Sequence, residues 1–338
     1  MKTYIKSFRD YILENSQLVK SGEESLKIQI LLRGCIGLTG KSEDFTKELM
    51  HKIYKDYIHL VLIKGVSGYN RNEKIPEDRR FNMFNDDLPV LNFTSRYHQF
   101  LDKSPRIYNR LEHYPIATDK KIFHKSFNDC KYVPKAVFSI RDIEKLTLPI
   151  IAKPKDGFSA QGIEVFETYD DAKKSDLEFD IWSEKKEIDT EFRVFIMNGK
   201  IIHLTERITN TSNDMSVGVK NPDEKIDLVY IDQDMTKFPY MNTIKDIHNK
   251  ISEKVELDFY NIDLMLDKSG DIWVPEINGA PGIGPSMVHH IYKNWLEMAY
   301  NMKMDKGTEN DLIGITNEHR RLMKKKYPKE YNSSVAPI

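Results

Sequence analysis

Three oxygen-bearing side chains, Asp263, Glu276 and Asn278, have the clearest chemical potential in this sequence. The residues around them alternate between apolar and polar on both sides of a turn at 268–270, as in a β-hairpin with one buried face. If both arms bring these side chains to the same end of the hairpin, three oxygen ligands converge there. Ligation by oxygen alone suits Mg²⁺ next to substrate phosphates, because this ion dehydrates reluctantly and takes few protein ligands. The alternative for each acid taken alone is an ordinary carboxylate that faces solvent.

Lys153 is a second candidate, because it ends an apolar stretch, 148–152, that predicts an interior strand. An unpaired ammonium group in such a place would be costly, so the lysine is expected to meet an anion. The loop that follows contains three small or polar residues, Gly157, Ser159 and Gln161. Its backbone N–H groups could close over the β- and γ-phosphates of a nucleotide. The alternative is a structural hairpin loop before a strand at 163–166.

A rival phosphate site is suggested by residues 35–42, where a strand leads into Gly-Lys-Ser and then into a helix, as in a P-loop. That motif requires glycine at the position of Cys35, and no aspartate follows at the end of the next strand. We therefore interpret this segment as an ordinary turn in which Ser42 caps the helix that follows.

The composition bounds the class of protein. The chain has 338 residues with 51 Lys and Arg against 52 Asp and Glu, so its net charge is −1. This balance argues against a mainly electrostatic nucleic-acid binder. No apolar run approaches the roughly 20 residues needed to span a bilayer, and the N-terminal residues lack the apolar core of a secretory signal. The two cysteines, Cys35 and Cys130, are interpreted as buried thiols of a cytoplasmic protein.

The first part of the chain predicts a parallel sheet. An amphipathic helix is expected at 3–20, followed by a strand at 27–32, a helix at 43–57 and a second strand at 59–63. A strand, helix and strand in this order form most simply a parallel pair with a crossover helix, as in a Rossmann-like lobe.

The rest of the chain must hold the candidate side chains. A helix is expected at 122–128 and a strand beginning at 132–135, and an Asn-Gly turn at 198–199 indicates a hairpin. Further helices are expected at 241–255, 287–302 and 318–327, the last of them basic and solvated.

Five segments between about 117 and 286 resemble, in type and in order, the ATP-grasp superfamily, which includes D-alanine–D-alanine ligases and ribosomal-protein glutamate ligases. The family has an Asp on one strand and Glu-x-Asn on the next, as in Asp263, Glu276 and Asn278. It also has an Asp-Lys pair before a helix and a Val-Pro element, here Asp119-Lys120 and Val133-Pro134. The segment from Lys153 to Gly162 is similar to its Lys-Pro and Gly/Ser loop.

The resemblance implies roles for the nucleotide-binding residues. Lys120 would contact the nucleotide phosphates, with Lys121 as a one-residue alternative, and Lys153 and its loop would do the same. In the hinge at 181–194 the backbone N–H and C=O groups beside Glu184 and Lys185 would bind the adenine. Glu191 would bind the ribose hydroxyls. Glu187 stands where the family has an apolar residue under the base.

The resemblance also implies residues at the reacting phosphate. Arg193 and Arg207 would hold the acyl-phosphate and the charge of the transition state. Some relatives place an arginine two residues before the first metal-binding Asp, but this chain has Asn261 there, so the role must be filled elsewhere. Lys220, in a loop at 209–222, would close on the phosphates, although a plain surface loop is an equal alternative.

The implied fold is α/β, an ATP-grasp fold behind an N-terminal Rossmann-like lobe. The expected parts are an N-terminal substrate lobe at 1–116, a small ATP-grasp subdomain with the glycine-rich loop at 117–182, and a large subdomain with the metal site at 183–305. A basic helix and tail would follow at 306–338.

The implied function is an ATP- and Mg²⁺-dependent ligase, with Mn²⁺ as an alternative ion, that activates a carboxylate as an acyl-phosphate and couples it to an amine. Backbone amides at 282–284 could receive a carboxylate, so amino acids or peptides are the expected substrates. Two alternatives remain: a kinase of the same fold that phosphorylates a hydroxyl group of a small molecule, and a nucleotide-binding module without catalysis. The sequence is compatible with a homodimer but does not fix the oligomeric state.

Overall fold

The computed structural model describes residues 26–32, 44–62, 85–94, 99–154, 162–175, 178–209 and 228–328. These residues form two compact units. The first contains the described residues up to Arg110 together with Gly282–Met323, and the second contains those of Leu111–Pro281 and 324–328. Within these ranges no helix is long and apolar enough to cross a membrane. The helix expected at 3–20 and the turn at 35–42 lie outside the described residues.

The first unit is built on a parallel sheet. Its strands, in spatial order, are β2 (Ile58–Leu62), β1 (Ile28–Leu32), β3 (Val90–Asn92) and β4 (Ile107–Tyr108). The helix α2 (Asp44–Asp56) connects β1 to β2, which pair in parallel, so the predicted strand–helix–strand unit is confirmed. Residues 28–31 of β1 are buried, as in other central parallel strands.

The helix α7 (Val288–Tyr300) also belongs to this unit, as does α8 (Lys306–Lys326) up to Met323. The ring of Tyr108 on β4 meets Trp295 on α7 edge to face, with 5.3 Å between centroids. The Tyr108 hydroxyl donates to the backbone oxygen of Met298 at 2.8 Å. The basic helix expected at 318–327 is the last part of the longer α8, whose earlier residues Leu312 and Ile315 are buried.

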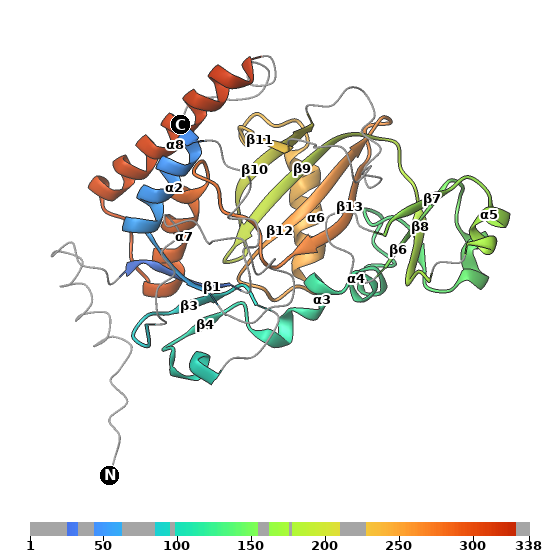
Figure 1. Cartoon of the computed structure of the whole chain (residues 1–338), viewed down its shortest axis with the longest axis horizontal. Coiled ribbons are helices and arrows are strands. Elements are labelled where there is room, and N and C mark those ends of the chain that lie inside the picture. The colour runs from blue at the N-terminus through green and yellow to red at the C-terminus, as the bar shows by residue number, and fades with distance from the viewer. Residues whose placement is uncertain are drawn as a thin grey trace, which may run out of the picture. The chain divides into compact units, whose positions relative to one another are not determined.

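The second unit contains two antiparallel sheets (Figure 1). The smaller consists, in spatial order, of β5 (Ala136–Val137), β8 (Ile181–Glu184), β6 (Ile150–Lys153) and β7 (Glu164–Phe166). A short helix, α5 (Tyr169–Lys174), follows β7. Phe166 and Trp182 pack together in the core of this sheet, with 5.6 Å between ring centroids. Lys153 ends β6, which lies between β8 and β7, so the predicted interior strand is confirmed.

The larger sheet has five strands. They are, in spatial order, β11 (Leu228–Asp232), β10 (Lys200–Thr209), β9 (Ile188–Met197), β12 (Phe259–Asp267) and β13 (Ile272–Asn278). Asn198 and Gly199 join β9 to β10 with φ angles of 51° and 69°. Two successive left-handed residues make the tight hairpin turn that Asn-Gly predicts.

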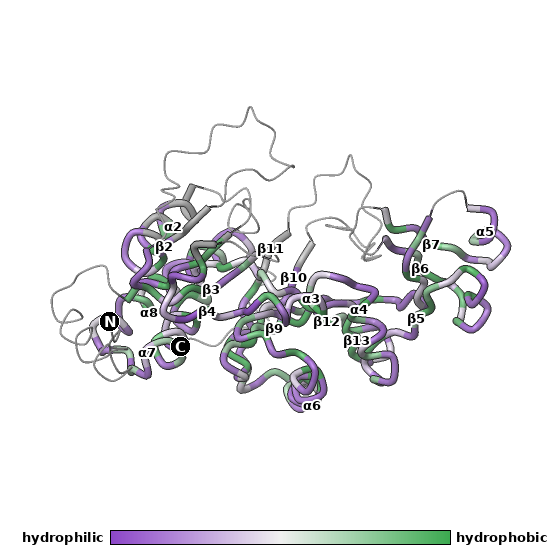
Figure 2. Tube along the Cα trace, turned by 90° about the horizontal axis from the view of Figure 1, so that it is seen from below, coloured by the Kyte–Doolittle hydropathy of each residue, from purple (hydrophilic) through white to green (hydrophobic). Residues whose placement is uncertain are grey.

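One face of this sheet is apolar. The helix α6 (Met241–Ser252) lies on one side of β9, β12 and β13 (Figure 1). The side of this helix that faces away from the sheet is hydrophilic (Figure 2). The helices α3 (Pro115–Thr118) and α4 (Lys120–Ser126) follow one another next to β13. Phe123 of α4 joins Ile247 of α6 and Ile262 of β12 in a single core. The alternate residues of the same strands must therefore point to the opposite face.

Strand β13 runs from Ile272 to Asn278, as the predicted hairpin arm requires, and contains an irregularity at Pro275. Asp263 lies opposite Glu276 but Met265 lies opposite Trp273, so β13 has one more residue than β12 between these pairs. Proline cannot donate a ladder hydrogen bond and is tolerated at such a bulge. The bulge puts Trp273 and Glu276 on the same face of the sheet.

Candidate functional site

The face opposite α6 carries a row of polar residues, one from each strand. The register pairs Glu276 with Asp263, Asp263 with Arg193, Arg193 with Thr205, and Thr205 with Asp232. Directly opposite residues of an antiparallel sheet share a face and lie close together. Three of the predicted site residues are therefore cross-strand neighbours.

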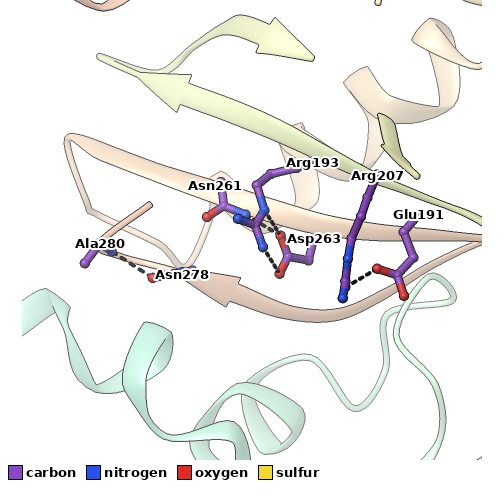
Figure 3. Close-up of polar contacts among 7 residues, drawn as sticks. All are labelled: Glu191, Arg193, Arg207, Asn261, Asp263, Asn278 and Ala280. Carbon is purple, nitrogen blue, oxygen red and sulfur yellow. Dashed lines mark hydrogen bonds and ion pairs between the residues drawn. The ribbon is translucent and has the colours of Figure 1, made fainter. Parts of the chain in front are cut away.

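Arg193 and Asp263 form a bidentate ion pair. Arg193 Nε donates to Asp263 Oδ1 at 2.8 Å, and Nη2 donates to Oδ2 at 3.2 Å. The amide of Asn261 donates to Oδ1 as well. The guanidinium comes from the neighbouring strand and not from the position two residues before Asp263, which Asn261 occupies (Figure 3).

Glu191 and Arg207 form a second ion pair on the same face, beside the first (Figure 3). Burial raises the pKa of Glu191, and the Asp263 carboxylate adds to this, while the charges of Arg207 and Arg193 oppose it. The two arginines and two acids therefore form one coupled group of charges at the middle of the sheet.

Glu276 pairs with Lys120, whose Nζ lies 3.1 Å from Oε2 of the carboxylate. Asp119 caps α4, because its carboxylate accepts from the backbone N–H groups of Lys121 and Ile122. In this helix Lys121 turns instead toward Asp180, at 3.8 Å. Of the two lysines left open by the sequence, Lys120 is the one that reaches Glu276.

Lys153 lies near the same charges. Burial lowers the pKa of Lys153, Glu276 opposes this effect, and Lys120 adds to it. The ammonium group makes no hydrogen bond or ion pair within the described part of the chain. Two lysines from different elements, α4 and β6, thus act on one carboxylate of β13.

Asn278 lies further along β13 (Figure 3). Its Oδ1 accepts from the backbone N–H of Ala280 at 2.9 Å and so shapes the turn that follows. The Tyr114 hydroxyl donates to the backbone oxygen of Gly279 at 3.2 Å. A Cβ at Gly279 would lie 2.8 Å from the Tyr114 ring, so this position requires glycine.

These donors are compatible with a hard divalent ion. Asp263, Glu276 and Asn278 share one face of one hairpin, and each offers oxygen. Among the described residues no group of three or more His, Cys, Asp or Glu could hold a metal, and this set contains two acids and one amide. Each acid already faces a cationic side chain, Glu276 facing Lys120 and Asp263 facing Arg193.

The hinge between the two sheets is fixed by side chains around Glu184. Lys186 Nζ lies 2.9 Å from Glu184 Oε2, and the backbone N–H of Thr147 donates to Oε1 at 3.3 Å. Burial alone would raise the pKa of Glu184, but these hydrogen bonds outweigh it, so the pKa is lowered. The backbone N–H of Lys185 donates to Pro149 at 2.9 Å.

Trp273 supports this hinge, a role that the sequence did not indicate. The Lys186 ammonium lies 4.0 Å from the centre of the Trp273 ring, a cation–π contact. The indole N–H donates to Asp267 at 2.7 Å. Glu187, in the position where the family has an apolar residue, turns outward to Lys268, with 77 % of its side chain exposed.

Four of the predicted site residues are not placed. Gly157, Ser159, Gln161 and Lys220 lie outside the described residues.

His124 and Thr205 also lie beside these charges, although the sequence analysis did not single them out. His124 lies four residues after Lys120, a spacing that puts both side chains on one face of a helix and could have drawn attention to it. Thr205 belongs to the polar row through its register with Arg193, which no local spacing reveals.

A parallel sheet followed by two antiparallel sheets, with charged residues on one face of the larger sheet, defines an ATP-grasp fold. The family described as D-ala D-ala ligase C-terminus matches residues 128–298. The match covers half of the chain, and the protein therefore belongs to this family of ATP-grasp ligases.

Solved structures agree with this fold. N5-carboxyaminoimidazole synthetase from Staphylococcus aureus, complexed with ADP, is similar with a TM-score of 0.55 at 12% identity, over 84% of this chain and 80% of that one. The VanG D-Ala:D-Ser ligase from Enterococcus faecalis is similar with a TM-score of 0.52 at 15% identity, over 86% of this chain and 99% of that one. No curated protein matches the sequence. At such identities the structures support the fold and leave the substrates open.

Proposed function

We propose that this protein uses ATP and Mg²⁺ to join a carboxylate to an amine. A carboxylate oxygen of the first substrate attacks the γ-phosphorus of ATP, and the bond from that phosphorus to the oxygen of ADP breaks. The amine then attacks the acyl carbon of the acyl-phosphate, releases inorganic phosphate and loses a proton. The family resemblance of the turn after Asn278 favours amino acids or peptides as substrates.

The observation that carries the proposal is the matched charge on the polar face of the large sheet. Lys120 and Glu276 neutralise one another across 3.1 Å, and Arg193 and Asp263 do the same across 2.8 Å. ATP and a divalent ion bring one new partner for each member of such a pair, an anion for the cationic group and a cation for the carboxylate. The site can therefore exchange internal ion pairs for ligands without leaving a charge unpaired.

The protein's own groups would act in distinct ways. Lys120 and Lys153 would hold the phosphates, and Arg193 and Arg207 would stabilise the charge that develops on the transferred group. Glu191, which already forms an ion pair with Arg207, would accept hydrogen bonds from the ribose hydroxyls. The backbone of the hinge at Glu184 and Lys185 would face the adenine.

Asp263, Glu276 and Asn278 would hold the Mg²⁺ ion. Bound there, Mg²⁺ would neutralise charge on the terminal phosphates. Gly157, Ser159, Gln161 and Lys220 complete the proposed nucleotide site.

The test is Glu276→Gln, which keeps the shape of the side chain and removes the charge that a divalent ion needs. We expect ADP formation to be abolished while the melting temperature stays close to that of the unchanged protein. The matched control is Glu144→Gln, which breaks an exposed ion pair to Lys173 and should leave ADP formation unchanged. Unchanged ADP formation by Glu276→Gln would contradict the proposal.

Amino acids and small carboxylic acids should be screened for ATP-dependent ADP release, with products identified by mass spectrometry. Adding hydroxylamine separates the possible reactions, because this nucleophile converts an acyl-phosphate to a hydroxamate. A ligase gives the hydroxamate. A kinase that acts on a hydroxyl group gives a stable phosphate ester, and that product would overturn the ligase proposal.

A further inference from the structure

His124 is a buried histidine that none of the proposed roles uses. It lies on α4 four residues after Lys120, so the two side chains share one face of the helix. The residue is only 1 % exposed. Neither ring nitrogen has a hydrogen-bond partner within the described part of the chain. A buried polar group without a hydrogen bond costs free energy and is rare in native proteins, so the buried imidazole needs an explanation.

The surroundings of His124 are cationic. Burial, together with the charges of Lys153 and Lys120, lowers the pKa of His124 to about 3. The ring is therefore neutral at neutral pH and carries one N–H donor and one acceptor nitrogen. Among the described residues no acid acts on it, whereas the buried His289 has the Glu309 carboxylate 3.7 Å from its Nε2.

The rest of α4 explains why the ring stays in this place. Phe123 and Phe127 of the same helix are buried in the core beneath the large sheet. Lys120, one turn before His124, reaches Glu276 on the polar face. The helix thus lies at the edge of the sheet, and its packing fixes the imidazole next to the ammonium groups. The two ammonium groups favour a negatively charged acceptor at this place.

We propose that His124 is a third phosphate-binding side chain of the nucleotide site and donates a ring N–H to a phosphate oxygen of the bound nucleotide. The inference rests on the proposed function, which assigns Lys120 and Lys153 to the phosphates. A phosphate supplies the missing hydrogen-bond acceptor and the negative charge in one group. His124 is in this view a binding residue that adds direction, because an imidazole N–H donates along one line while an ammonium group does not.

The first test measures binding of ATP, adenosine and inorganic tripolyphosphate by calorimetry in the presence of Mg²⁺. His124→Phe keeps a buried ring and removes the donor, and we expect it to weaken ATP and tripolyphosphate by about tenfold or more, as for other hydrogen bonds to charged groups. Adenosine binding should not change. His124→Gln keeps an N–H donor and should recover part of the affinity.

The matched control is His248→Phe, which replaces a buried histidine on α6, within the core-forming helix. It should leave the affinity for tripolyphosphate unchanged. If His124→Phe weakens adenosine as strongly as ATP, or if the control has the same effect, the imidazole is structural and the inference is overturned.

The two proposals fail in different ways. If the unchanged protein binds ATP and tripolyphosphate and His124→Phe binds both equally well, the histidine assignment is wrong and the ligase proposal stands. If the unchanged protein binds neither, both are wrong. Binding of tripolyphosphate but not of ATP, with loss in His124→Phe, supports the anion site and contradicts the nucleotide assignment.

A second measurement covers the case in which His124→Phe does not fold. Nitrogen NMR of the unchanged protein with labelled histidine, with the His124 resonances assigned from their loss in His124→Gln, reports hydrogen bonding of the ring directly. Tripolyphosphate should shift these resonances. If tripolyphosphate binds and the His124 resonances do not shift, the ring does not bind phosphate and the inference is overturned.

Discussion

The two faces of the five-stranded sheet are made by the same strands and differ completely in character. Phe192, Val194 and Ile196 of β9 point into the core beneath α6. Alternating with them, Glu191 and Arg193 of the same strand belong to the charged group on the other face. A strand alternates with period two, so each one serves both faces. The fold and the proposed chemistry are thus separated by side-chain direction and not by position along the chain.

The faces also balance their interactions differently. The apolar face is stabilised by the burial of apolar surface, an interaction that does not depend on direction. The polar face compensates its charges in pairs, as in Arg193 with Asp263 and Lys120 with Glu276. A substitution on the apolar face should therefore lower the free energy of unfolding in proportion to the side-chain volume that it removes. On the polar face its effect should depend on whether the partner is changed at the same time.

The largest effect on stability is expected from Leu264→Ala, which truncates a core side chain on β12 that is only 1 % exposed. It should lower the free energy of unfolding by about 2–5 kcal/mol, as for other buried leucines. The control is Met265→Ala, the next residue, which points to the polar face opposite Trp273 and is half-buried. Urea unfolding measures both. Equal losses would mean that the two faces do not differ as described.

The pH dependence of stability should show the effect of His124, which is buried as deeply as a core residue but lies beside charges. Its pKa is about 3 in the folded protein against 6.5 ordinarily, so below pH 6.5 the unfolded chain binds a proton that the folded protein does not. Stability is therefore lost as the pH falls from 6.5 toward 3. Between pH 7 and pH 4 this group alone should cost about 3 kcal/mol.

The measurement is a series of urea unfolding curves from pH 7 to pH 4. His124→Phe carries no titrating group and should lose less stability on acidification than the unchanged protein by that amount. If the free energies of unfolding of the two proteins change with pH in the same way, His124 has its ordinary pKa in the folded protein.

A smaller effect is expected from separating Arg193 and Asp263. Arg193→Met leaves the half-buried carboxylate without its bidentate partner and should lower the free energy of unfolding by about 1–2 kcal/mol. Asp263→Asn should cost a similar amount. In the double variant the loss should be smaller than the sum, because no charge is left unpaired. Simple additivity would contradict the pairwise compensation on this face.

Much of the fold follows from local patterns. The alternation around Asp263 predicts a strand, the Asn-Gly pair predicts the β9–β10 turn, and the N-terminal strand–helix–strand order predicts the parallel sheet. These features depend on residues that are close in sequence, whose propensities and turn requirements can be read directly. The family resemblance added the order of the sheets, which alternation alone does not give.

What could not be predicted depends on register and on burial. The sequence shows Asn261 where an arginine is sought, but only the pairing of β9 with β12 reveals that Arg193 reaches Asp263 from the side. The bulge at Pro275 likewise changes which residues share a face with Glu276. Register across strands is set by the whole sheet, and a shift by one residue would invert every assignment.

The smallest effect, and one of opposite sign, is expected from Thr205→Val. Thr205 lies in the polar row opposite Arg193, is buried, and its hydroxyl has no hydrogen-bond partner within the described residues. Replacing an unpaired buried hydroxyl by a methyl group of similar size should raise the free energy of unfolding by up to about 1 kcal/mol.

Thr316→Val is the matched control, because the buried hydroxyl of Thr316 donates to the backbone oxygen of Leu312 at 3.0 Å, and losing that bond should lower stability by about 1 kcal/mol. Stabilisation at Thr205 together with loss of ATP turnover would mean that the polar face keeps this hydroxyl for a ligand. Destabilisation at Thr205 equal to that at Thr316 would mean that the hydroxyl is already satisfied in the folded protein. The polar row would then be stabilised by its internal contacts in the same way as the core, and the contrast between the two faces would be weaker than the register indicates.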